Sequence, residues 1–483
     1  IVVGTVDQVL LSTLMVPHAH LRAAALLRHL LVVDEVHASD AYMTRLLEEV
    51  LAHHVGAGGH TLLLSATLGA AARCRLEGAA TNTERPCPLL GAATAAAYPL
   101  VTAEVRGDVR TELVVEEPGS PKRVTVELAP WMDDASAVAE RAVAAAERGA
   151  RVLVIRNTVT DCVATQLAAE HQAADRGSKH VLLRAGTAPV PHHSRYARKD
   201  REALDCALEA AFGRDGVAGH VLAIATQTVQ QSLDIDADLL LTDLCPADVL
   251  LQRIGRLFRH SDRRRPDGFE AARVVVLVPQ ERDLGERIAR DGTLRGQHGI
   301  GSVYEDAAVL EATWLELERR PELDLPAHNR VLVEQSTHPE ALDAIAAGRG
   351  PAWQRHREHV LGRILGDRRV ASLNLVDRRA EFGEFEFPCG ETERRITTRL
   401  GEGDRLLTFA EPIPGLAGPV HMLTMPAWMA RGVPAEAEPT VLERAEHRAR
   451  FTFGEREYVY DRLGLRLAPE KSEEHGDEEE DGG

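Results

Sequence analysis

The chain has 483 residues, a hydrophobic fraction of 44% and a formal net charge of −18, and its length predicts about three domains. No uncharged apolar run is long enough to cross a membrane, and the six cysteines form no Cys-x-x-Cys pair, so we expect a cytoplasmic chain with no membrane association, no disulfide framework and no zinc site. The net negative charge by itself argues against a nucleic-acid partner.

The first residues predict a strand, Ile1–Val3, followed by a turn at Gly4 and Thr5. This turn offers a hydroxyl and free backbone N–H groups, which suit a phosphate of a nucleic-acid backbone. A plain strand–helix turn is the alternative. Because the chain begins with Ile1 rather than Met, already inside a strand-like run, we expect it to be a fragment that lacks its amino-terminal part.

Residues 30–37 read Leu-Leu-Val-Val-Asp-Glu-Val-His. The four aliphatic residues predict a central strand buried on both faces of a parallel sheet. The carboxylates of Asp34 and Glu35 then lie at the edge of the sheet where ligands bind. There Asp34 could hold Mg²⁺ while Glu35 orients or deprotonates an attacking water. The alternative is a strand that meets a helix through an acidic N-cap.

A second short strand, Thr61–Leu64, ends in Ser65-Ala66-Thr67. The hydroxyls of Ser65 and Thr67 can hydrogen-bond to the acidic loop and report its state to another domain. Taken alone, the three residues would be an ordinary turn. Their position about thirty residues after the acidic strand makes the functional interpretation more specific.

A change of pattern follows, and it predicts a domain boundary. Residues 112–116 and 123–128 flank Pro118-Gly119-Ser120-Pro121 like a hairpin. We assign residues 1–90 to a first domain and 91–130 to a connection with a hairpin. Strands and helices then alternate over 131–282, which predicts a second parallel sheet. Its strands are expected at 152–155, 181–183, 221–225, 239–242 and 274–278, with helices near 135–148, 160–172, 197–212 and 247–258.

Three loops of this second sheet are candidate functional loops, because each carries polar residues beside a predicted strand or helix. For the middle loop, a contact to a nucleic-acid backbone is more plausible than a zinc site, since adjacent histidines at 192 and 193 chelate poorly and no cysteine is near. The loops contain Asn157 and Thr158, then Arg195, then Thr226 and Gln227.

The predicted helix at 247–258 carries Gln252, Arg256 and Arg259 at positions i, i+4 and i+7, so one helical face would present an amide and two guanidiniums. Such a face can clamp a phosphoryl group during its transfer. A solvated arginine face is the alternative. Further on we expect a helical linker over 283–370, a small β-rich domain over 371–468, and a disordered tail over 469–483, of which 471–483 holds seven acids.

The ordered strings Asp-Glu-x-His, Ser-Ala-Thr and Gln-Arg-x-Gly-Arg-x-x-Arg together resemble a superfamily 2 helicase. That resemblance implies an α/β fold with two RecA-like parallel-sheet domains, followed by the helical linker and a small accessory carboxy-terminal domain. Asp34–Asp40, Gln231–Asp236 and Arg259-His260 narrow it to the CRISPR-associated helicase of type I interference systems. The resemblance covers residues 1–280 well. In this family an RNA-guided surveillance complex recruits the enzyme, which runs 3′ to 5′ on single-stranded DNA while an HD nuclease cuts.

The resemblance also implies roles for individual residues. Asp34 would bind Mg²⁺-ATP, Glu35 would activate water, and Arg256 and Arg259 would be arginine fingers. His37, Ser65, Thr67 and Gln252 would couple the sites. Asp234 and Arg253 would contact the nucleotide. The DNA backbone would be held by Gly4, Thr5, Asn157, Thr158, Arg195, Thr226 and Gln227.

Two departures from the family pattern qualify the resemblance. None of the four lysines follows a glycine, so the phosphate-binding loop Gly-x-x-x-x-Gly-Lys-[Ser/Thr] is absent from the chain. No histidine is followed by aspartate, so the metal-binding pair of an HD nuclease is absent as well. We therefore expect this chain to be inactive alone. The competing hypotheses are another superfamily 2 helicase or translocase and a catalytically inactive nucleic-acid-binding module.

Overall fold

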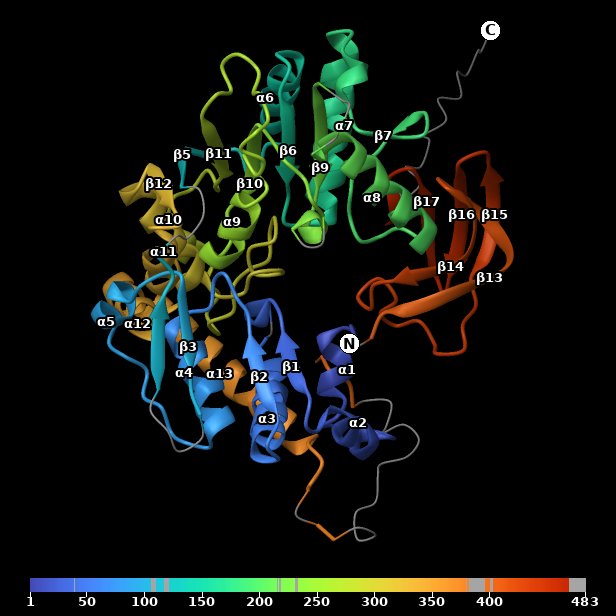
Figure 1. Ribbon diagram of the computed structural model, residues 1–483. Helices are drawn as coiled ribbons and strands as arrows, with labels where there is room; N and C mark the ends of the chain where they lie inside the picture. The colour runs from blue at the N-terminus through green and yellow to red at the C-terminus, as the bar shows by residue number, and fades with distance from the viewer. Residues whose placement is uncertain are drawn as a thin grey trace, which may run out of the picture.

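The computed structural model describes residues 1–38, 40–105, 110–116, 121–214, 216, 219–230, 233–378, 380–381, 396–399 and 403–468. Figure 1 shows two lobes, linker helices that run beside both, and a β-rich domain at the carboxyl end. None of the helices in these ranges combines the length and apolarity needed to cross a membrane. Several predicted features lie outside the described residues, namely Gln231-Ser232, the turn at 118–120, the alternating segment 382–387 and the tail from 469.

The first lobe contains a two-stranded parallel sheet in which β1 (Leu30–Val33) pairs in register with β2 (His60–Leu63). Helix α3 (Ala41–Gly56) connects the two strands and packs against them, and Asp40 caps it by accepting a hydrogen bond from the Met43 amide. The other elements of this lobe are α1 (Val6–Leu10), α2 (Ala19–Leu26), the 3₁₀ turn η1 (Val36–Ala38), α4 (Ala70–Thr81), α5 (Leu90–Ala95), β3 (Leu100–Ala103) and β4 (Thr111–Val114).

The acidic strand is covered on one face. Leu31 and Val33 are buried with α3, whereas Leu30 is 62% and Val32 49% exposed. The prediction of a strand buried on both faces is therefore wrong for the described residues, because successive side chains point to opposite faces and only one face is packed. The expected strand at Ile1–Val3 is also not formed, and these residues are exposed.

The predicted hairpin between 112–116 and 123–128 is replaced by different pairings. Thr111–Val114 (β4) pairs antiparallel with β3, while β5 (Lys122–Ala129) runs parallel to β11 (Ala272–Leu277) in the second lobe. Proline and glycine between two extended runs indicate a chain reversal, but they do not determine which strands pair.

The second lobe is built on a six-stranded sheet of order β12-β5-β11-β10-β6-β9, parallel except for the edge strand β12. The predicted strands at 152–155, 221–225, 239–242 and 274–278 are confirmed. The one at 181–183 is instead a 3₁₀ turn followed by a single bridge between Leu182 and Leu222. The remaining elements of this lobe are α6 (Ala135–Glu147), β6 (Arg151–Ile155), α7 (Val159–Asp175), η2 (Lys179–Val181), β7 (Arg184–Ala185), β8 (Ala188–Pro189), α8 (Arg198–Phe212), β9 (Val221–Ala225), η3 (Gln227–Val229), β10 (Leu239–Asp243), α9 (Ala247–Ile254), η4 (Leu284–Arg287) and β12 (Glu322–Leu325).

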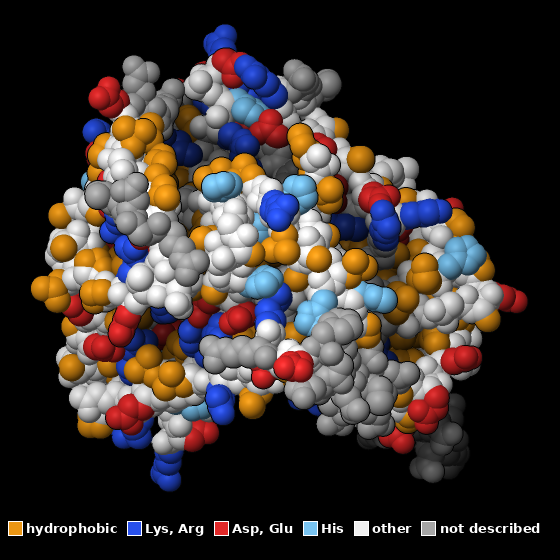
Figure 2. Space-filling view, turned by 60° about the horizontal axis from the view of Figure 1, so that its bottom comes forward, with side chains coloured by type: hydrophobic (Ala, Val, Ile, Leu, Met, Phe, Trp, Pro, Cys, Tyr) orange, Lys and Arg blue, Asp and Glu red, His pale blue; other side chains and the backbone are white. Residues whose placement is uncertain are grey.

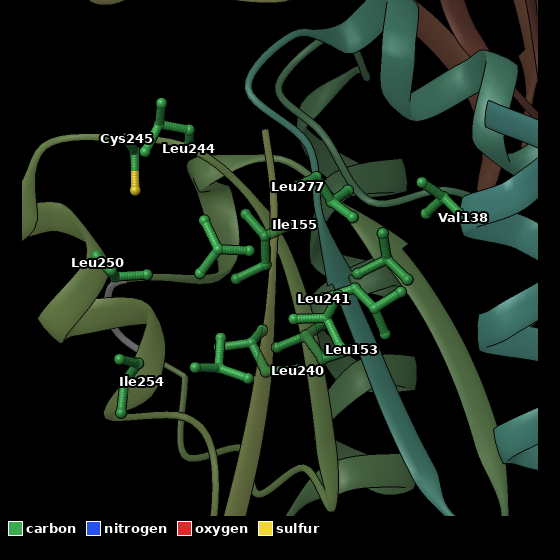
Figure 3. Close-up of a cluster of buried hydrophobic side chains, with 14 of the residues drawn as sticks. Val138, Leu153, Ile155, Leu240, Leu241, Leu244, Cys245, Leu250, Ile254 and Leu277 are labelled. Atoms are coloured by element: carbon green, nitrogen blue, oxygen red, sulfur yellow. The ribbon is translucent and has the colours of Figure 1, made fainter. Parts of the chain in front are cut away.

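Continuous aliphatic runs in the central strands explain this core, since β6, β9 and β10 are buried along their whole length. Helix α9 contributes Leu250 and Ile254 to the same cluster as Leu153 and Leu240 of the sheet (Figure 3). The helix ends at Ile254 and not at 258, because Leu257 forms a bridge with Ala237 and Phe258 takes a positive φ of 50°. Arg256 and Arg259 thus follow the helix instead of lying on it, which corrects the predicted i, i+4, i+7 face.

Four linker helices connect the lobes: α10 (Ala307–Arg319), α11 (Asn329–Thr337), α12 (Pro339–Arg349) and α13 (Pro351–Leu373). On α11 the buried Glu334 accepts a hydrogen bond of 2.9 Å from the Ala70 amide at the start of α4. On α13 Arg368 donates two hydrogen bonds, of 2.9 and 2.8 Å, to the Glu48 carboxylate on α3. These contacts attach the linker firmly to the first lobe.

The carboxy-terminal domain consists of antiparallel strands, which confirms the expected β-rich region. Its core is shared with the second lobe, because Tyr196 and Leu204 belong to the same buried cluster as Phe451 and Tyr460. The strands are β13 (Arg405–Gly415), β14 (Gly418–Met425), β15 (Thr440–Ala445), β16 (Arg448–Phe453), β17 (Arg456–Asp461) and β18 (Gly464–Leu467).

A buried ion pair stabilises the second lobe. Arg156 donates to both oxygens of Asp243, at 2.9 and 3.1 Å, and also to Thr165 and the Met132 carbonyl. We expect Arg156→Ala to lower the free energy of unfolding by about 3–5 kcal/mol, because it leaves the Asp243 charge buried and unpaired.

The matched control is Arg123→Ala, which removes the exposed pair with Asp324 on a strand of the same sheet and should cost far less stability than Arg156→Ala, because water screens an exposed pair. Urea unfolding of both variants gives the comparison. Equal losses in the two variants would contradict the importance of the buried pair.

Candidate active site at the junction of the lobes

The loops after β1 and β2 lie side by side. The Leu64 amide donates to the Val33 carbonyl at 2.9 Å, and the Val36 amide donates to the Leu64 carbonyl at 3.1 Å. Between them Glu35 takes a positive φ of 52°, a conformation that costs free energy for a residue with a Cβ and is frequent at functional sites. The Asp34 Oδ1 atom supports this turn by accepting the Glu35 amide at 2.9 Å. Both carboxylates are exposed.

His37 stands at the centre of a polar cluster at this edge. Its Nδ1 atom lies 2.8 Å from Ser65 Oγ and 3.4 Å from Glu35 Oε2. The Thr67 amide donates to the same Ser65 Oγ at 3.2 Å. The structure thus brings together Glu35, His37, Ser65 and Thr67, although they come from two separate strand ends.

The second lobe reaches this cluster through Gln252 on α9, whose Nε2 atom is hydrogen-bonded to His37 Nε2. An amide nitrogen can only donate, so His37 Nε2 accepts. In the neutral imidazole the proton then resides on Nδ1. From there it is donated toward Ser65 Oγ and faces the Glu35 carboxylate.

The two predicted arginine fingers have different surroundings. Arg256 donates to the carbonyls of Leu233 and Gln230 at 2.7 and 2.5 Å. Burial lowers its pKa, the neighbouring Arg259 adds to this, and the negative charges of Asp234 and Glu35 oppose it. Glu35 therefore lies within electrostatic reach of the opposite lobe.

Arg259 and Asp234 form an exposed ion pair, with Nε and Oδ1 2.6 Å apart. Behind this pair are two buried aspartates, Asp236 and Asp238, that bind Arg263 and Arg265. Burial alone would raise the pKa of Asp236, but hydrogen bonds from Arg265 and Arg263 lower it below the usual range. Sequence reasoning missed this network, for which the run of three arginines at 263–265 was the available signal.

Arg253 and Asn157 lie in the interior of the second lobe. The Arg253 side chain is fully buried and donates to Thr242 Oγ1 at 2.6 Å, to Asn157 Oδ1 at 3.0 Å and to the Tyr304 hydroxyl at 3.1 Å. The Asn157 amide in turn donates to the Leu244 carbonyl at 2.9 Å. In this structure both side chains therefore organise the core beneath the loops and do not face solvent.

Thr158 caps α7 by accepting the Asp161 amide at 3.0 Å. The Asp161 carboxylate also binds His298, at 2.7 Å, and the other ring nitrogen of His298 is 3.2 Å from Asp133. The hydrogen bond with Asp161 raises the pKa of His298, and the charge of Asp133 contributes to the rise. This clamp beside the Asn157–Thr158 loop was not predicted from the sequence.

The other predicted DNA-contact residues are distributed over three places. Thr226 is buried, and Gln227 donates to the Asn157 carbonyl at 2.9 Å. Arg195 lies over the ring of Trp428 in the carboxy-terminal domain, 5.0 Å from its centroid, and burial lowers the Arg195 pKa. Gly4 and Thr5 precede α1 and are exposed. The Arg195 loop is thus part of the contact with the carboxy-terminal domain.

The described residues contain no group of three or more His, Cys, Asp and Glu side chains that could enclose a metal ion. Mg²⁺ does not need such a group, because it usually binds through one or two carboxylates together with nucleotide phosphates. The exposed Asp34 carboxylate fits that requirement.

Comparison with known proteins shows a consistent likeness. Residues 148–262 match the family model described as CRISPR-associated nuclease/helicase Cas3, C-terminal. The CRISPR-associated endonuclease/helicase Cas3 of Escherichia coli strain K12 is 36% identical over 324 residues, which are 65% of this chain and 33% of the relative. The protein of that name from Thermus thermophilus is 30% identical over 438 residues, or 84% of this chain and 45% of the relative. The chain thus spans less than half the length of these curated relatives.

Comparison with solved structures shows the same likeness at the level of the fold. The crystal structure of T. fusca Cas3 with AMPPNP superimposes with a TM-score of 0.74 at 22% identity, covering 96% of this chain and 56% of that one. A crystal structure titled as a CRISPR-associated protein gives a TM-score of 0.72 at 26% identity, with coverage of 96% and 54%. The predicted arrangement of two RecA-like domains with a linker and an accessory domain is confirmed at the level of the fold.

The His298 clamp predicts a pH-dependent stability. A raised pKa means that the clamp stabilises the fold fully below the unfolded histidine pKa of about 6.5 and loses this contribution as pH rises through the folded value. Burial alone would raise the pKa of Asp161, but its hydrogen bonds to His298 and Thr158 lower the pKa below the usual value. The stability that the Asp161 carboxylate contributes is therefore lost only as pH falls through this lowered pKa. His298→Asn, which tolerates the positive φ of 50°, should cost more stability at pH 6 than at pH 9.

Chemical denaturation at the two pH values measures this difference. His171→Asn is the control, because its pair with Asp175 is exposed on both sides. A His298→Asn cost that is the same at both pH values would contradict a charged clamp.

Proposed function

Because this chain belongs to the Cas3 helicase family of CRISPR systems, we propose that it forms the motor region of an ATP-dependent 3′–5′ single-stranded-DNA translocase in type I CRISPR interference. The observation that carries the proposal is the meeting of the acidic strand end with α9 at the lobe junction, where Gln252 contacts His37. Such an edge of a parallel sheet is where nucleotides bind in α/β folds.

The residues at the junction have different proposed roles in ATP hydrolysis. Asp34 would hold Mg²⁺, which when bound offsets negative charge on the phosphates. Glu35 accepts a proton from the attacking water or orients it, and its position is fixed by the backbone turn and by His37. Arg256 and Arg259 are the cationic groups for the transferring phosphoryl group. In the structure they bind the carbonyls of Gln230 and Leu233 and the Asp234 carboxylate, so a nucleotide would have to replace these partners.

We propose that the phosphate-binding loop comes from polypeptide outside these residues. Within the chain no lysine follows a glycine, so no lysine is placed to reach the β- and γ-phosphates in such a loop. The exposed apolar face of the first sheet supports this view, because Leu30, Val32 and Leu62 are the kind of side chains that further elements of a sheet domain cover. By itself the chain then hydrolyses no ATP.

Single-stranded DNA is the proposed track, and it would be contacted through its backbone. Lys and Arg side chains are interspersed with Asp and Glu on the face in Figure 2, so binding would come from local groups and not from overall charge. Gly4, Thr5, Arg195 and Gln227 are the proposed contacts. Thr158 and the buried Asn157 and Thr226 would act through their backbone atoms.

The proposed partners are an RNA-guided surveillance complex and an HD nuclease, both in the cytoplasm. A structure titled "CRISPR RNA-guided surveillance complex, pre-nicking" contains a chain that superimposes with a TM-score of 0.68 at 22% identity. That complex contains the other protein, and it supports the same class of partner for this chain.

The test is Glu35→Gln in the protein that includes a phosphate-binding loop. ATP turnover on single-stranded DNA should fall by about 10²–10⁴-fold, because a general base is removed, while ATP binding by equilibrium titration should remain. Glu84→Gln removes an exposed carboxylate from the same lobe and should leave turnover unchanged. Turnover of Glu35→Gln equal to that of the parent would contradict the assignment of Glu35.

A further inference from the structure

Helix α9 carries a second polar side chain on the turn that precedes Gln252. Asp248 lies four residues before Gln252, and side chains with this spacing are neighbours on a helix surface. Its Oδ1 atom is inaccessible to solvent and has no hydrogen-bond partner among the described residues. Buried carboxylate oxygens without partners are rare in native proteins and call for an explanation.

The surroundings of Asp248 connect it with the opposite lobe. Burial raises the pKa of its carboxyl group, and the backbone amide of Val249 and the nearby His37 ring oppose that rise. Asp248 and His37 therefore lie within electrostatic range of each other, although His37 belongs to the loop after β1 in the first lobe. Gln252, which contacts His37, lies beside it on the same helix.

An amide NH₂ group has two N–H donors. One donor of Gln252 is directed at His37 Nε2. Gln–Asp hydrogen bonds between residues four apart are a known stabilising pair on helices. The described residues supply no hydrogen bond to the Asp248 Oδ1 atom, so its contact with the second N–H requires a change of the Gln252 or Asp248 rotamer.

We propose that Asp248 is a positioning residue, whose carboxylate accepts the second N–H of the Gln252 amide and so keeps the amide nitrogen turned toward His37. The orientation of the Gln252 amide determines which ring nitrogen of His37 carries the proton. With the Gln252 nitrogen facing it, His37 Nε2 must accept, and the proton stays on Nδ1. If the amide turned over, Gln252 Oε1 would face Nε2, the proton would move there, and a bare Nδ1 lone pair would face Glu35.

This proton placement affects Glu35 directly. A protonated Nδ1, 3.4 Å from Glu35 Oε2, attracts the carboxylate, whereas an unprotonated Nδ1 repels it. Asp248 would thus act on Glu35 through Gln252 and His37, across the lobe junction. The effect on Glu35 rests on the proposed function, while the effect on the His37 tautomer does not.

A simpler role for Asp248 is to stabilise the amino-terminal end of α9, where a carboxylate interacts favourably with the helix dipole. That role would make Asp248→Ala less stable without any change of the His37 tautomer. The two roles therefore differ in what happens at the imidazole.

The experiment is long-range ¹H–¹⁵N NMR of the ¹⁵N-histidine-labelled chain near pH 8, with the His37 signals identified from their absence in His37→Gln. We expect Nδ1–H in the parent and a shift of the tautomer population toward Nε2–H in Asp248→Ala. Gln252→Ala should cause a shift as well. Asp262→Ala, which removes an exposed aspartate paired with Arg214 in the same lobe, should leave the His37 signals unchanged.

An unchanged His37 tautomer in Asp248→Ala would overturn the proposal, whether or not Gln252→Ala causes a shift. A second arm uses the protein with its phosphate-binding loop, where Asp248→Ala should lower kcat about tenfold and leave KM for ATP unchanged. A tautomer shift with normal kcat would keep the role of Asp248 at His37 and refute its link to hydrolysis. Since the NMR arm needs neither ATP nor DNA, it is independent of whether the chain is a translocase.

Discussion

The hydrogen bond between His37 and Gln252 is the interaction on which the arrangement of the site depends. It joins the end of a strand in the first lobe to a helix of the second lobe, so that the acidic pair and the arginines face one junction. Each of the two side chains is held in place by further contacts within its own lobe. The His37 ring is held by Ser65, and α9 is anchored by the fully buried Arg253. Because close-packed interiors deform little, packed elements such as these tend to move from one discrete position to another and not continuously.

The linker helices contact both lobes, whereas the carboxy-terminal domain shares its core with the second lobe. Arg368 and Glu334 attach the linker helices to the first lobe, whereas Asp200 of the second lobe is buried under the carboxy-terminal domain and accepts hydrogen bonds from Tyr460 and from the Ala417 amide at 2.5 and 2.7 Å. A bidentate pair between Arg462 and Glu170 reinforces that second contact. The carboxy-terminal domain is therefore positioned to move with the second lobe, and Arg195 lies at their boundary.

Prediction from the sequence was most accurate where a single local pattern determines the structure. Runs such as Val152–Ile155 and Val221–Ala225 are aliphatic enough to indicate central strands, and their buried state confirms it. The closeness of Ser65 to the acidic loop also followed from the rule that parallel strand ends meet at one edge, whereas His37 entered the prediction only through the family resemblance. These features depend on local pattern and on sheet geometry, which the sequence contains.

Other features depend on contacts between distant residues and were missed. The end of α9 is set by the bridge between Ala237 and Leu257, and helix propensity alone carries no information on that bridge. The pairing of β5 with β11 involves strands far apart in the chain. The burial of Asn157 beneath its loop likewise became visible only once Arg253 and Leu244 were placed around it.

A double-mutant cycle on His37 and Gln252 tests the central claim most directly. ATP turnover on single-stranded DNA is measured for His37→Ala, Gln252→Ala and the double variant, in the protein that includes a phosphate-binding loop. If the two side chains couple the lobes through their mutual contact, the double variant should be about as slow as the slower single variant, with an interaction energy of about 0.5–3 kcal/mol. Losses that simply add, with no interaction energy, would contradict the account.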